Sequence, residues 1–338
     1  MSSRRQRILS GIQPSGDIHI GNYLGAIKNW AESLDTYECL FPIVDYHAMT
    51  IPYDPGEMPQ RIYNAICANV ACGLDPERCT LFIQSQVPEH TELCWILTCI
   101  SSLGALERMT QFKEKSQRQA DREGINTGLL AYPVLMAADI LIYKAEVVPV
   151  GEDQVQHLEL AREIARRFNN TFGETFPEPE AKLSQAPRIL GLDGKNKMSK
   201  SLNNHIAIID PPEVVEEKLL RAVTDENRKR RSDPGDPDVC NIFSLHKLFS
   251  TPEEISWVNR ECRIAGIGCI ECKRVLIKHV NEMLTPIRER YWEIYHRPDR
   301  VREVVEEGAK RARSIARETL AEVKDRCGLK LPAVPEMV

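Results

Sequence analysis

Residues 7–22 read RILSGIQPSGDIHIGN and decide the fold. Their first part, residues 7–11, is a short apolar run typical of a strand, and the proline and glycines that follow are typical of a loop. From about residue 21 to residue 31 the large apolar side chains recur at helical spacing. The chain is therefore predicted to open with a strand, a loop and a helix.

Three further apolar runs predict strands, at residues 39–44, 80–83 and 147–150. Helical segments separate them, among them residues 58–71. Continuous apolar strands that alternate with helices indicate a parallel sheet covered on both faces, so we predict a Rossmann-like, doubly wound α/β fold. Residues of about 88–143 are helical and too long for a single crossover, and we interpret them as a helical insertion in the sheet.

The second part of the chain has a different character, because helical periodicity dominates it. Asp210, followed by two prolines, predicts a helix start with Asp210 as the N-cap. Two long amphipathic helices are expected at about 265–296 and 299–327. We therefore predict a catalytic domain of residues 1–190 and an all-helical domain of residues 191–338, whose last helix packs back on the catalytic domain.

The composition limits the classes of protein that the chain can belong to. The 338 residues are 42% hydrophobic and 28% charged, with a formal net charge of −5. That balance is typical of a globular protein and excludes a uniformly basic surface for DNA, although a local basic face is compatible with it. No apolar run reaches the roughly 18 residues of a membrane span, and the N-terminus lacks the pattern of a secretory signal. We expect a cytoplasmic protein with no membrane partner.

A polar motif, His19-Ile-Gly21-Asn22, occupies the start of the first predicted helix. Helix N-termini attract phosphate through their free N–H groups and the helix dipole. His19 and Asn22 are donors three residues apart, on one side of the first turn, and Gly21 lets a nucleotide approach the backbone closely. Taken alone, the motif is also compatible with a polar turn that a capping asparagine closes.

A second polar motif, GKNKMSKS at residues 194–201, places Lys197 and Lys200 three positions apart. Two lysines with hydroxyls and a glycine form a cationic loop that is able to fold over a polyphosphate and neutralise charge that develops in a transition state. Taken alone, this motif is also compatible with a solvated lysine loop.

Together, the two motifs resemble the HIGH and KMSKS signatures of the class I aminoacyl-tRNA synthetases in order, separation and context. Residues 197–201 match the second signature letter for letter, and Asn22 stands where the first has its second histidine. Over nearly its whole length the chain resembles the tryptophan-specific subgroup, which commonly has that asparagine. Supporting segments are residues 10–16, 44–48, 109–116 and 151–157.

The stretch YPVLMAAD at residues 132–139 bears on specificity. If it is helical, Tyr132, Met136 and Asp139 share one face. Similar tyrosine-specific enzymes usually have glutamine in place of Met136, whose thioether suits a large aromatic ring. Asp139 is able to accept an indole N–H, and a carboxylate left unpaired would reject phenylalanine strongly. On its own the stretch is also compatible with a core helix that contains one paired aspartate.

The resemblance implies ATP-dependent activation of L-tryptophan to its adenylate, followed by transfer to tRNA(Trp). The tryptophan carboxylate is already ionised, so positioning and charge stabilisation carry the reaction, and Mg²⁺ would travel with ATP. The residues implied at the triphosphate as catalytic groups are His19, Asn22, Lys115, Lys197 and Lys200. Those implied at tryptophan are Leu9, Tyr132, Met136, Asp139, Val148, Val150 and Gln154. Those implied at ATP are Gln13, Ser15, Gly21, Asn22, Gly151, Asp153, Lys197, Met198, Ser199, Lys200 and Ser201.

Four late cysteines, Cys240, Cys262, Cys269 and Cys272, have the spacing Cys-x21-Cys-x6-Cys-x2-Cys. Four thiolates suit a tetrahedral zinc site or an iron–sulfur cluster. Some bacterial members of the resembled subgroup carry a four-iron cluster on a similar pattern, so the resemblance implies a [4Fe–4S] cluster, with zinc or free thiols as alternatives. The six cysteines in the first 100 residues lie mostly among apolar neighbours and are instead predicted to be small buried hydrophobes.

Partners are also implied by the resemblance: a homodimer formed through the insertion at about 88–143, and a tRNA whose anticodon the helical domain reads. The basic run Arg228-Lys-Arg-Arg231 is compatible with a tRNA backbone contact or with a solvated loop. Two other functions stay open. One is a tyrosine-specific sister enzyme, against which Met136 counts. The other is a non-catalytic nucleotide- or tRNA-binding paralogue with a redox-sensing cluster, against which the lysines of the second motif count.

Overall fold

The computed structural model describes residues 4–113, 126–183 and 189–330. Five parallel strands form one sheet in the order β3-β2-β1-β4-β5. The strands are β1 (Arg7–Leu9), β2 (Glu38–Ile43), β3 (Thr80–Ile83), β4 (Val147–Val150) and β5 (Glu180–Leu183). The four predicted strands and the Rossmann-like α/β class are confirmed.

Strand β5 was not predicted from the sequence. Its residues, EAKL, are all exposed, so no apolar run marks it. It lies at the edge of the sheet and pairs with β4, where Val150 lies opposite Leu183. An edge strand that is solvated on both faces loses the hydrophobic pattern by which a strand is recognised.

The strand order reverses at β1. Ile8 pairs with Cys39 of β2 on one side and with Val147 of β4 on the other. In an open parallel sheet, ligands bind beyond the carboxyl ends of the strands at such a switch point. The loop after β1 carries the first polar motif, so the topology places that motif at this point.

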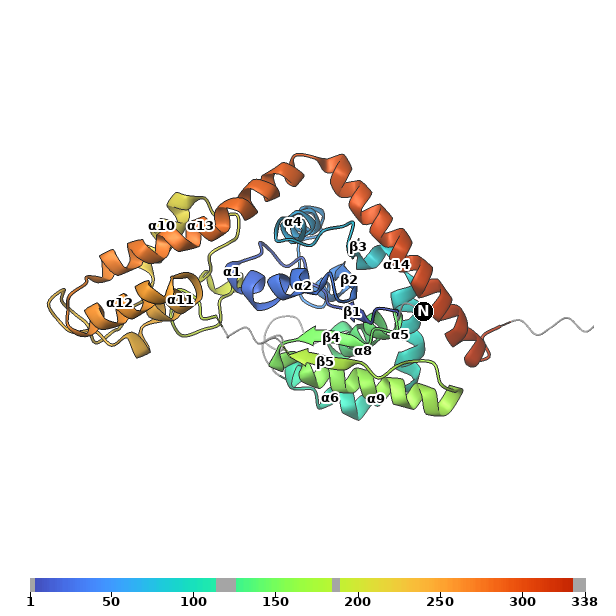
Figure 1. Cartoon of the computed structure of the whole chain (residues 1–338). Helices are drawn as coiled ribbons and strands as arrows, with labels where there is room; N and C mark the ends of the chain where they lie inside the picture. Colours follow the sequence, from blue (N-terminus) through green and yellow to red (C-terminus); the bar gives the residue numbers. More distant parts are fainter. Residues whose placement is uncertain (1–3, 114–125, 184–188, 331–338) are drawn as a thin grey trace, which may run out of the picture.

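Helices flank the sheet (Figure 1). In the first part of the chain they are α1 (Ile20–Asn22), the π-helical η1 (Tyr23–Ile27), α2 (Lys28–Ser33), α3 (Asp45–Ala48), α4 (Met58–Ala71), α5 (Glu89–Ile100), α6 (Leu103–Glu107), α8 (Thr127–Leu141) and α9 (Val155–Phe172). The predicted first helix is thus α1, η1 and α2 in succession. The predicted insertion contains α5, α6 and α8, between β3 and β4.

The second part of the chain contains α10 (Pro212–Arg221), α11 (Asn241–Phe249), α12 (Pro252–Arg263), α13 (Cys269–Tyr295) and α14 (Pro298–Arg326). The first three gather around one end of α13, away from the sheet, and α13 and α14 meet at an angle (Figure 1). These last two are 27 and 29 residues long. Within the described ranges, no helix combines the length and apolarity that crossing a membrane requires.

Asp210 does not cap α10, and that prediction was wrong. Pro211 is the N-cap residue. The Asp210 carboxylate instead accepts the backbone N–H of Ala207 at 2.8 Å and the ammonium of Lys218 at 2.6 Å. Because the N–H of Ala207 and the ammonium of Lys218 bind the Asp210 carboxylate, the carboxylate does not accept from the N–H groups at the start of α10. Asp210 therefore joins the preceding turn to the body of α10.

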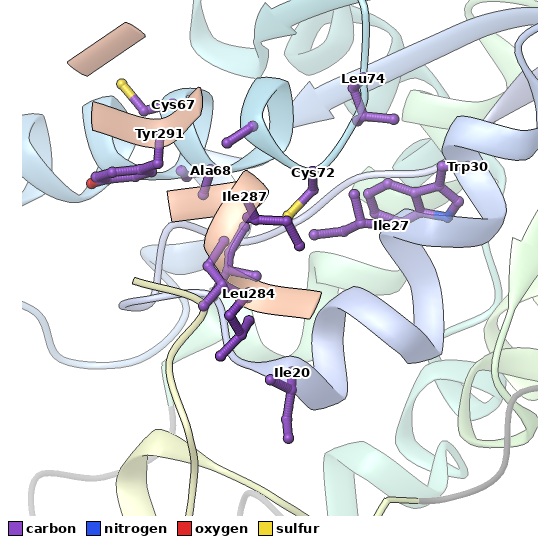
Figure 2. Close-up of a cluster of buried hydrophobic side chains, with 14 of the residues drawn as sticks. Ile20, Ile27, Trp30, Cys67, Ala68, Cys72, Leu74, Leu284, Ile287 and Tyr291 are labelled. Atoms are coloured by element: carbon purple, nitrogen blue, oxygen red, sulfur yellow. The ribbon is translucent and has the colours of Figure 1, made fainter. Parts of the chain in front are cut away.

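Helix α13 packs into the same core as the first helices of the chain. Figure 2 shows Leu284, Ile287 and Tyr291 of α13 close to side chains of α4 such as Ala68 and of the first helices such as Ile20. All of these side chains are buried. The helical region is therefore bound to the sheet layer by shared apolar burial.

Helix α14 lies along β3, the edge strand opposite β5 (Figure 1). Gly308 allows the close approach, since a Cβ there would overlap the carbonyl oxygen of Leu81. Farther along, buried Glu89 of α5 accepts from Nε of Arg313 at 2.9 Å and of Arg317 at 3.1 Å. The helix thereby covers an edge that would otherwise stay open to pairing.

Most of the early cysteines are buried, as predicted. Cys39, Cys67, Cys72 and Cys79 are buried and Cys94 partly so. Burial raises the pKa of the Cys67 and Cys72 thiols to about 12. Cys99 is exposed on α5, so the prediction does not hold for it.

Candidate active site

The two polar motifs lie against each other. The N–H of Ile20, beside His19, donates to the carbonyl oxygen of Ile206 at 3.0 Å. Lys200 Nζ lies 3.8 Å from Asp17 Oδ2, and it reaches the loop so closely that a Cβ at Gly16 would lie 2.7 Å from it. Segments about 180 positions apart in the sequence therefore form one surface at the switch point of the sheet.

His19 and Asn22 cap each other at the start of α1. His19 Nδ1 accepts the N–H of Asn22 at 3.3 Å, and Asn22 Oδ1 accepts the N–H of His19 at 3.2 Å. Because Nδ1 is an acceptor, the ring proton is on Nε2, which is the donor available to a ligand. Burial, with nearby His205 and Lys197, lowers the pKa of His19 to about 4. The ring is therefore a neutral donor at pH 7.

Asn204 orders the loop of the second motif. Its Oδ1 accepts the N–H of Ser199 at 2.7 Å, and its Nδ2 donates to Asp193 Oδ2 at 3.0 Å. Lys197 and Lys200 are exposed on this ordered loop. The loop thus presents two ammonium groups beside the first motif.

His205 belongs to the same surface, and the sequence analysis missed it. Its ring centroid lies 5.9 Å from that of His19, and the residue is 9% exposed. Neither its spacing nor its neighbours distinguish it in the sequence. Only the pairing of residues 206–208 with the first motif brings it there.

A cavity of about 720 Å³ opens at the carboxyl ends of β1 and β4. Tyr132, Met136 and Asp139 all line it, which confirms that α8 presents them on one face. All seven residues implied at tryptophan are among the lining residues: Leu9, Tyr132, Met136, Asp139, Val148, Val150 and Gln154. Gln13, Gly25 and Gly151 also line the cavity, whereas His19, Asn22, Lys197 and Lys200 are not among its lining residues.

One end of the cavity is polar. The hydroxyl of Tyr132 lies 3.1 Å from Gln111 Oε1, to which it donates, and 2.8 Å from His157 Nε2. Burial raises the pKa of Tyr132 to about 12, so the phenol stays neutral. Gln154 Nε2 donates to Asp153 Oδ2 at 2.9 Å, which leaves Gln154 Oε1 as the acceptor of that side chain.

Asp139, 3% exposed, receives donors from three other elements. Oδ1 lies 2.6 Å from His90 Nδ1 and 2.8 Å from Gln84 Nε2, and Oδ2 lies 2.7 Å from His47 Nε2 and 2.9 Å from Gln84 Nε2. Although burial alone would raise it, the donors His47 and His90 hold the pKa of Asp139 at about 2. These three donors could not be predicted from the sequence, because residues 47, 84 and 90 share no spacing with residue 139.

The remaining predicted site residues fall into three groups. Lys115 lies outside the described residues. Met198, 2% exposed, packs beside Gly21, and Ser199 lies 2.8 Å from Ser201 between their hydroxyl oxygens. Ser15 and Asp153 are exposed and are not among the residues that line the cavity.

The four late cysteines are neighbours in the helical region. Burial, together with the charges of Cys240, Cys262 and Cys269, raises the pKa of Cys272 to about 12. In the part of the chain that the structure describes, however, no three His, Cys, Asp or Glu side chains have an arrangement suited to a metal ion. The thiols are near one another but are not arranged as ligands, so the donor set fits a cluster and the geometry does not.

The basic run divides into two kinds of residue. Arg228 donates to the carbonyl oxygens of Arg231 at 2.9 Å and of Ile267 at 2.8 Å. Arg231 donates to the carbonyl oxygen of Gly266 at 3.1 Å. Lys229 and Arg230 are exposed. Two arginines of the run therefore hold backbone carbonyls, and Lys229 and Arg230 are the members for which a solvated loop and a tRNA contact both stay open.

The chain as a whole is similar to proteins of known function. Residues 1–285 match the family model described as tRNA synthetases class I (W and Y). The chain is 52% identical over 327 residues to the tryptophan–tRNA ligase of Deinococcus radiodurans, with 95% of this chain and 98% of that protein covered. The chain belongs to the tryptophanyl-tRNA synthetase family.

Further relatives agree with this membership. The tryptophan–tRNA ligase of Thermotoga maritima is 45% identical over 321 residues, covering 94% of this chain and 98% of that protein. The crystal structure of the tryptophanyl-tRNA synthetase from Campylobacter jejuni, complexed with ADP and tryptophan, is similar with a TM-score of 0.86 and 38% identity, over 95% of this chain and 99% of that one. A tryptophanyl-tRNA synthetase is an aminoacyl-tRNA synthetase, so the non-catalytic and tyrosine-specific alternatives give way to the tryptophan-specific enzyme.

Proposed function

We propose that the chain activates L-tryptophan with ATP and transfers it to tRNA(Trp). An oxygen of the tryptophan carboxylate forms a bond to the α-phosphorus of ATP, and the bond from that phosphorus to the oxygen bridging to the β-phosphate breaks, which releases pyrophosphate. The terminal ribose hydroxyl of the tRNA then attacks the carbonyl carbon of the adenylate and releases AMP. The convergence of the two polar motifs, together with a cavity of about 720 Å³ at the carboxyl ends of β1 and β4, carries this proposal.

Tryptophan is proposed to bind in the cavity that α8 lines. Met136, with Leu9, Val148 and Val150, forms apolar walls for the indole, and Asp139 accepts its N–H. Tyr132 and Gln154 bind the α-ammonium. Support comes from the cavity, which both side chains line, and from the raised pKa of Tyr132, which keeps its phenol neutral.

ATP is proposed to extend from this cavity to the first motif. His19, as a neutral donor, and Asn22 bind the triphosphate, and Lys197 and Lys200 neutralise charge that grows as pyrophosphate leaves. Lys115 is proposed to contact the triphosphate as well. Gln13 is proposed to bind at the carboxylate or ribose side, and Ser15, Gly151 and Asp153 are proposed to bind ATP. Mg²⁺, bound to the ATP phosphates, would supply further charge neutralisation.

The test is exchange of labelled pyrophosphate into ATP. The chain should catalyse it with L-tryptophan and not with L-tyrosine at the same concentration. Exchange that needs tyrosine, or no exchange with either amino acid, would refute the assignment of this activity to the chain.

The helical region is proposed to bind the tRNA. We keep the division into a catalytic domain of residues 1–190 and a helical domain of residues 191–338, with exposed Lys229 and Arg230 as backbone contacts. The proposed place of this reaction is the cytoplasm. A footprint of the tRNA on the chain, measured by hydrogen exchange, should include α11 and α12; protection confined to the sheet would contradict this division.

A homodimer is proposed to form through the insertion. Trp95 on α5 is 70% exposed and Leu103 on α6 is 60% exposed, which is unusual for large apolar side chains. Replacing both with serine should convert a dimer, measured by light scattering, into a monomer. A wild-type chain that is already monomeric at micromolar concentration would contradict the proposal.

The four late cysteines are proposed to hold a [4Fe–4S] cluster, with zinc as the alternative. Support comes from four neighbouring thiols with Arg228, whose guanidinium lies 3.7 Å from Cys262 Sγ. Protein purified without oxygen should be coloured and contain iron and acid-labile sulfide, and Cys262→Ser should lose both while Cys327→Ser keeps them. A colourless protein with one zinc per chain would refute the cluster.

A further inference from the structure

The donors around Asp139 differ in their position relative to the cavity. His47 lines the cavity, whereas His90 and Gln84 are not among its lining residues and are both 0% exposed. A ligand in the cavity therefore meets His47 and Asp139 but not the other two donors. The donors to Asp139 are therefore of two kinds. Gln84 and His90, here called the rear donors, lie behind the carboxylate, and His47 lies on the side of the cavity.

Gln84 is locked in its orientation. Its Oε1 accepts the backbone N–H of Tyr46 at 3.1 Å. The amide nitrogen must therefore face Asp139, where Nε2 lies within 2.9 Å of both carboxylate oxygens. This donor stays in place whatever fills the cavity.

His90 is locked as well, by Tyr143. Its Nε2 lies 2.6 Å from the hydroxyl oxygen of Tyr143, which is 0% exposed. Asp139 is ionised, so Nδ1 of His90 must carry a proton, and in the neutral ring Nε2 then accepts the O–H of Tyr143. One ring orientation and one tautomer satisfy both contacts.

His47 has a different setting. Its Nε2 donates to Oδ2 of Asp139 at 2.7 Å, and its ring lies edge-on to Tyr132 at 6.3 Å between centroids. With His90 and Gln84 it leaves the carboxylate fully paired before any ligand arrives, because a carboxylate accepts about four hydrogen bonds. An unpaired Asp139 is therefore not what would reject a ligand that lacks an N–H.

We propose that Gln84 and His90, the latter braced by Tyr143, are positioning residues that hold Asp139 as a fixed acceptor, and that His47 is the exchangeable donor whose place the indole N–H takes. This inference rests on the proposed function, since it concerns how the same cavity selects tryptophan. Recognition is then an exchange of one donor for another. The rear donors fix the orientation of the Asp139 carboxylate. His47 sets the affinity for a ligand that has no N–H to donate, because it keeps its own hydrogen bond to Asp139 when such a ligand binds.

The experiment compares tryptophan with β-(3-benzothienyl)alanine, in which sulfur replaces the indole N–H. The dissociation constant of each is measured by calorimetry without ATP, and KM and kcat are measured in pyrophosphate exchange. We define the preference as the ratio of the two dissociation constants. The wild-type chain should prefer tryptophan by roughly 3- to 5-fold, less than the tenfold or more that one hydrogen bond to a charged group is worth, because His47 keeps its bond to Asp139 when the analogue binds.

The two kinds of donor should shift the preference in opposite directions. His90→Leu should reduce the preference to about 1, through KM with little change in kcat. His90→Asn, whose amide nitrogen replaces Nδ1, should restore it. His47→Ala should increase the preference by roughly threefold, because Asp139 then lacks one donor when the benzothienyl analogue is bound. His47→Gln, which supplies a donor again, should return the preference to the wild-type value.

Tyr143→Phe removes a single hydroxyl and tests the brace even if His90→Leu does not fold. It should reduce the preference in the same direction, with circular dichroism showing a folded chain. If His90→Leu and Tyr143→Phe weakened the binding of both ligands equally, His90 and Tyr143 would have only a structural role. That result would overturn the proposal that they position Asp139. A reduced preference in His47→Ala would overturn the exchange. Absence of tryptophan-dependent exchange in the wild type would instead mean that the proposed function has failed.

Discussion

The backbone N–H of Ile20 donates to the carbonyl oxygen of Ile206 at 3.0 Å. This bond joins the helix start that follows His19 to the segment that follows Lys200. Its consequence is that the imidazole of the first motif and the ammonium groups of the second face one region of space. Each motif alone is compatible with an ordinary solvated turn, and their junction makes a shared phosphate site the better interpretation.

Replacing Lys200 with alanine should slow the chemical step. The rate constant of adenylate formation in a single turnover should fall by about 100-fold, while the dissociation constant of tryptophan changes by less than about threefold, because the lysine faces the phosphates and not the indole. Lys195→Ala is the control, since Lys195 is 73% exposed on the same loop and pairs with Glu226. A normal single-turnover rate in Lys200→Ala would remove the lysine from the mechanism.

Replacing Met136 with glutamine should weaken tryptophan binding. A buried amide without partners costs about 1–3 kcal/mol, so KM for tryptophan should rise roughly 5- to 100-fold. Met136→Leu, which keeps the volume, should change KM much less. If Met136→Gln bound tryptophan as well as the wild type, the apolar wall would not be a determinant of specificity.

Stability should fall on mild acidification, partly through His19. The unfolded chain binds a proton at this residue below pH 6.5, whereas the folded chain binds it only near pH 4. The folded state therefore takes up fewer protons between these values, and its free energy of unfolding falls as the pH falls. Between pH 7 and pH 5, wild type should lose about 1–2 kcal/mol more than His19→Asn, measured by urea unfolding. Parallel losses in the two proteins would show that His19 titrates normally.

Replacing Gly308 with alanine should separate α14 from the sheet. The new Cβ would overlap the carbonyl oxygen of Leu81, a backbone atom that cannot move without disturbing β3. We expect a loss of about 3 kcal/mol or more in the free energy of unfolding. Gly104→Ala is the matched control, because its nearest neighbour is the flexible end of Arg108 at 3.2 Å. Equal melting temperatures for the two variants would contradict the close packing of α14.

Substitutions in the basic run, residues 228–231, should affect either tRNA binding or stability, depending on which residues are replaced. Replacing Lys229 and Arg230 with serine should weaken tRNA binding and reduce the slope of log affinity against log salt by about 1 to 2, with tryptophan activation unchanged. Replacing Arg228 and Arg231 should instead lower the melting temperature, because their backbone partners lose donors. If replacing Lys229 and Arg230 left the slope of log affinity against log salt unchanged, residues 228–231 would not contact the tRNA.

Much of the fold followed from local patterns. Strands β3 and β4 and helix α4 begin and end where the apolar runs predicted, because buried strands and amphipathic helices carry their periodicity in the sequence. Strand β5 and the cap of α10 did not follow. Strand β5 is an edge strand with no apolar face. Asp210 does not cap α10 because its carboxylate binds Lys218 and the N–H of Ala207 instead.

The sequence alone determined which chemical groups are available: a histidine donor at a helix start, two lysines in one loop, and a methionine and an aspartate on one face of a helix. Only the tertiary structure decided what surrounds them. His47, Gln84 and His90 reach Asp139 from three separate elements, and His205 reaches His19 through the pairing of residues 206–208. The physical reason is that hydrogen bonds and burial depend on distance in space, and residues far apart in sequence share no period that would reveal their approach.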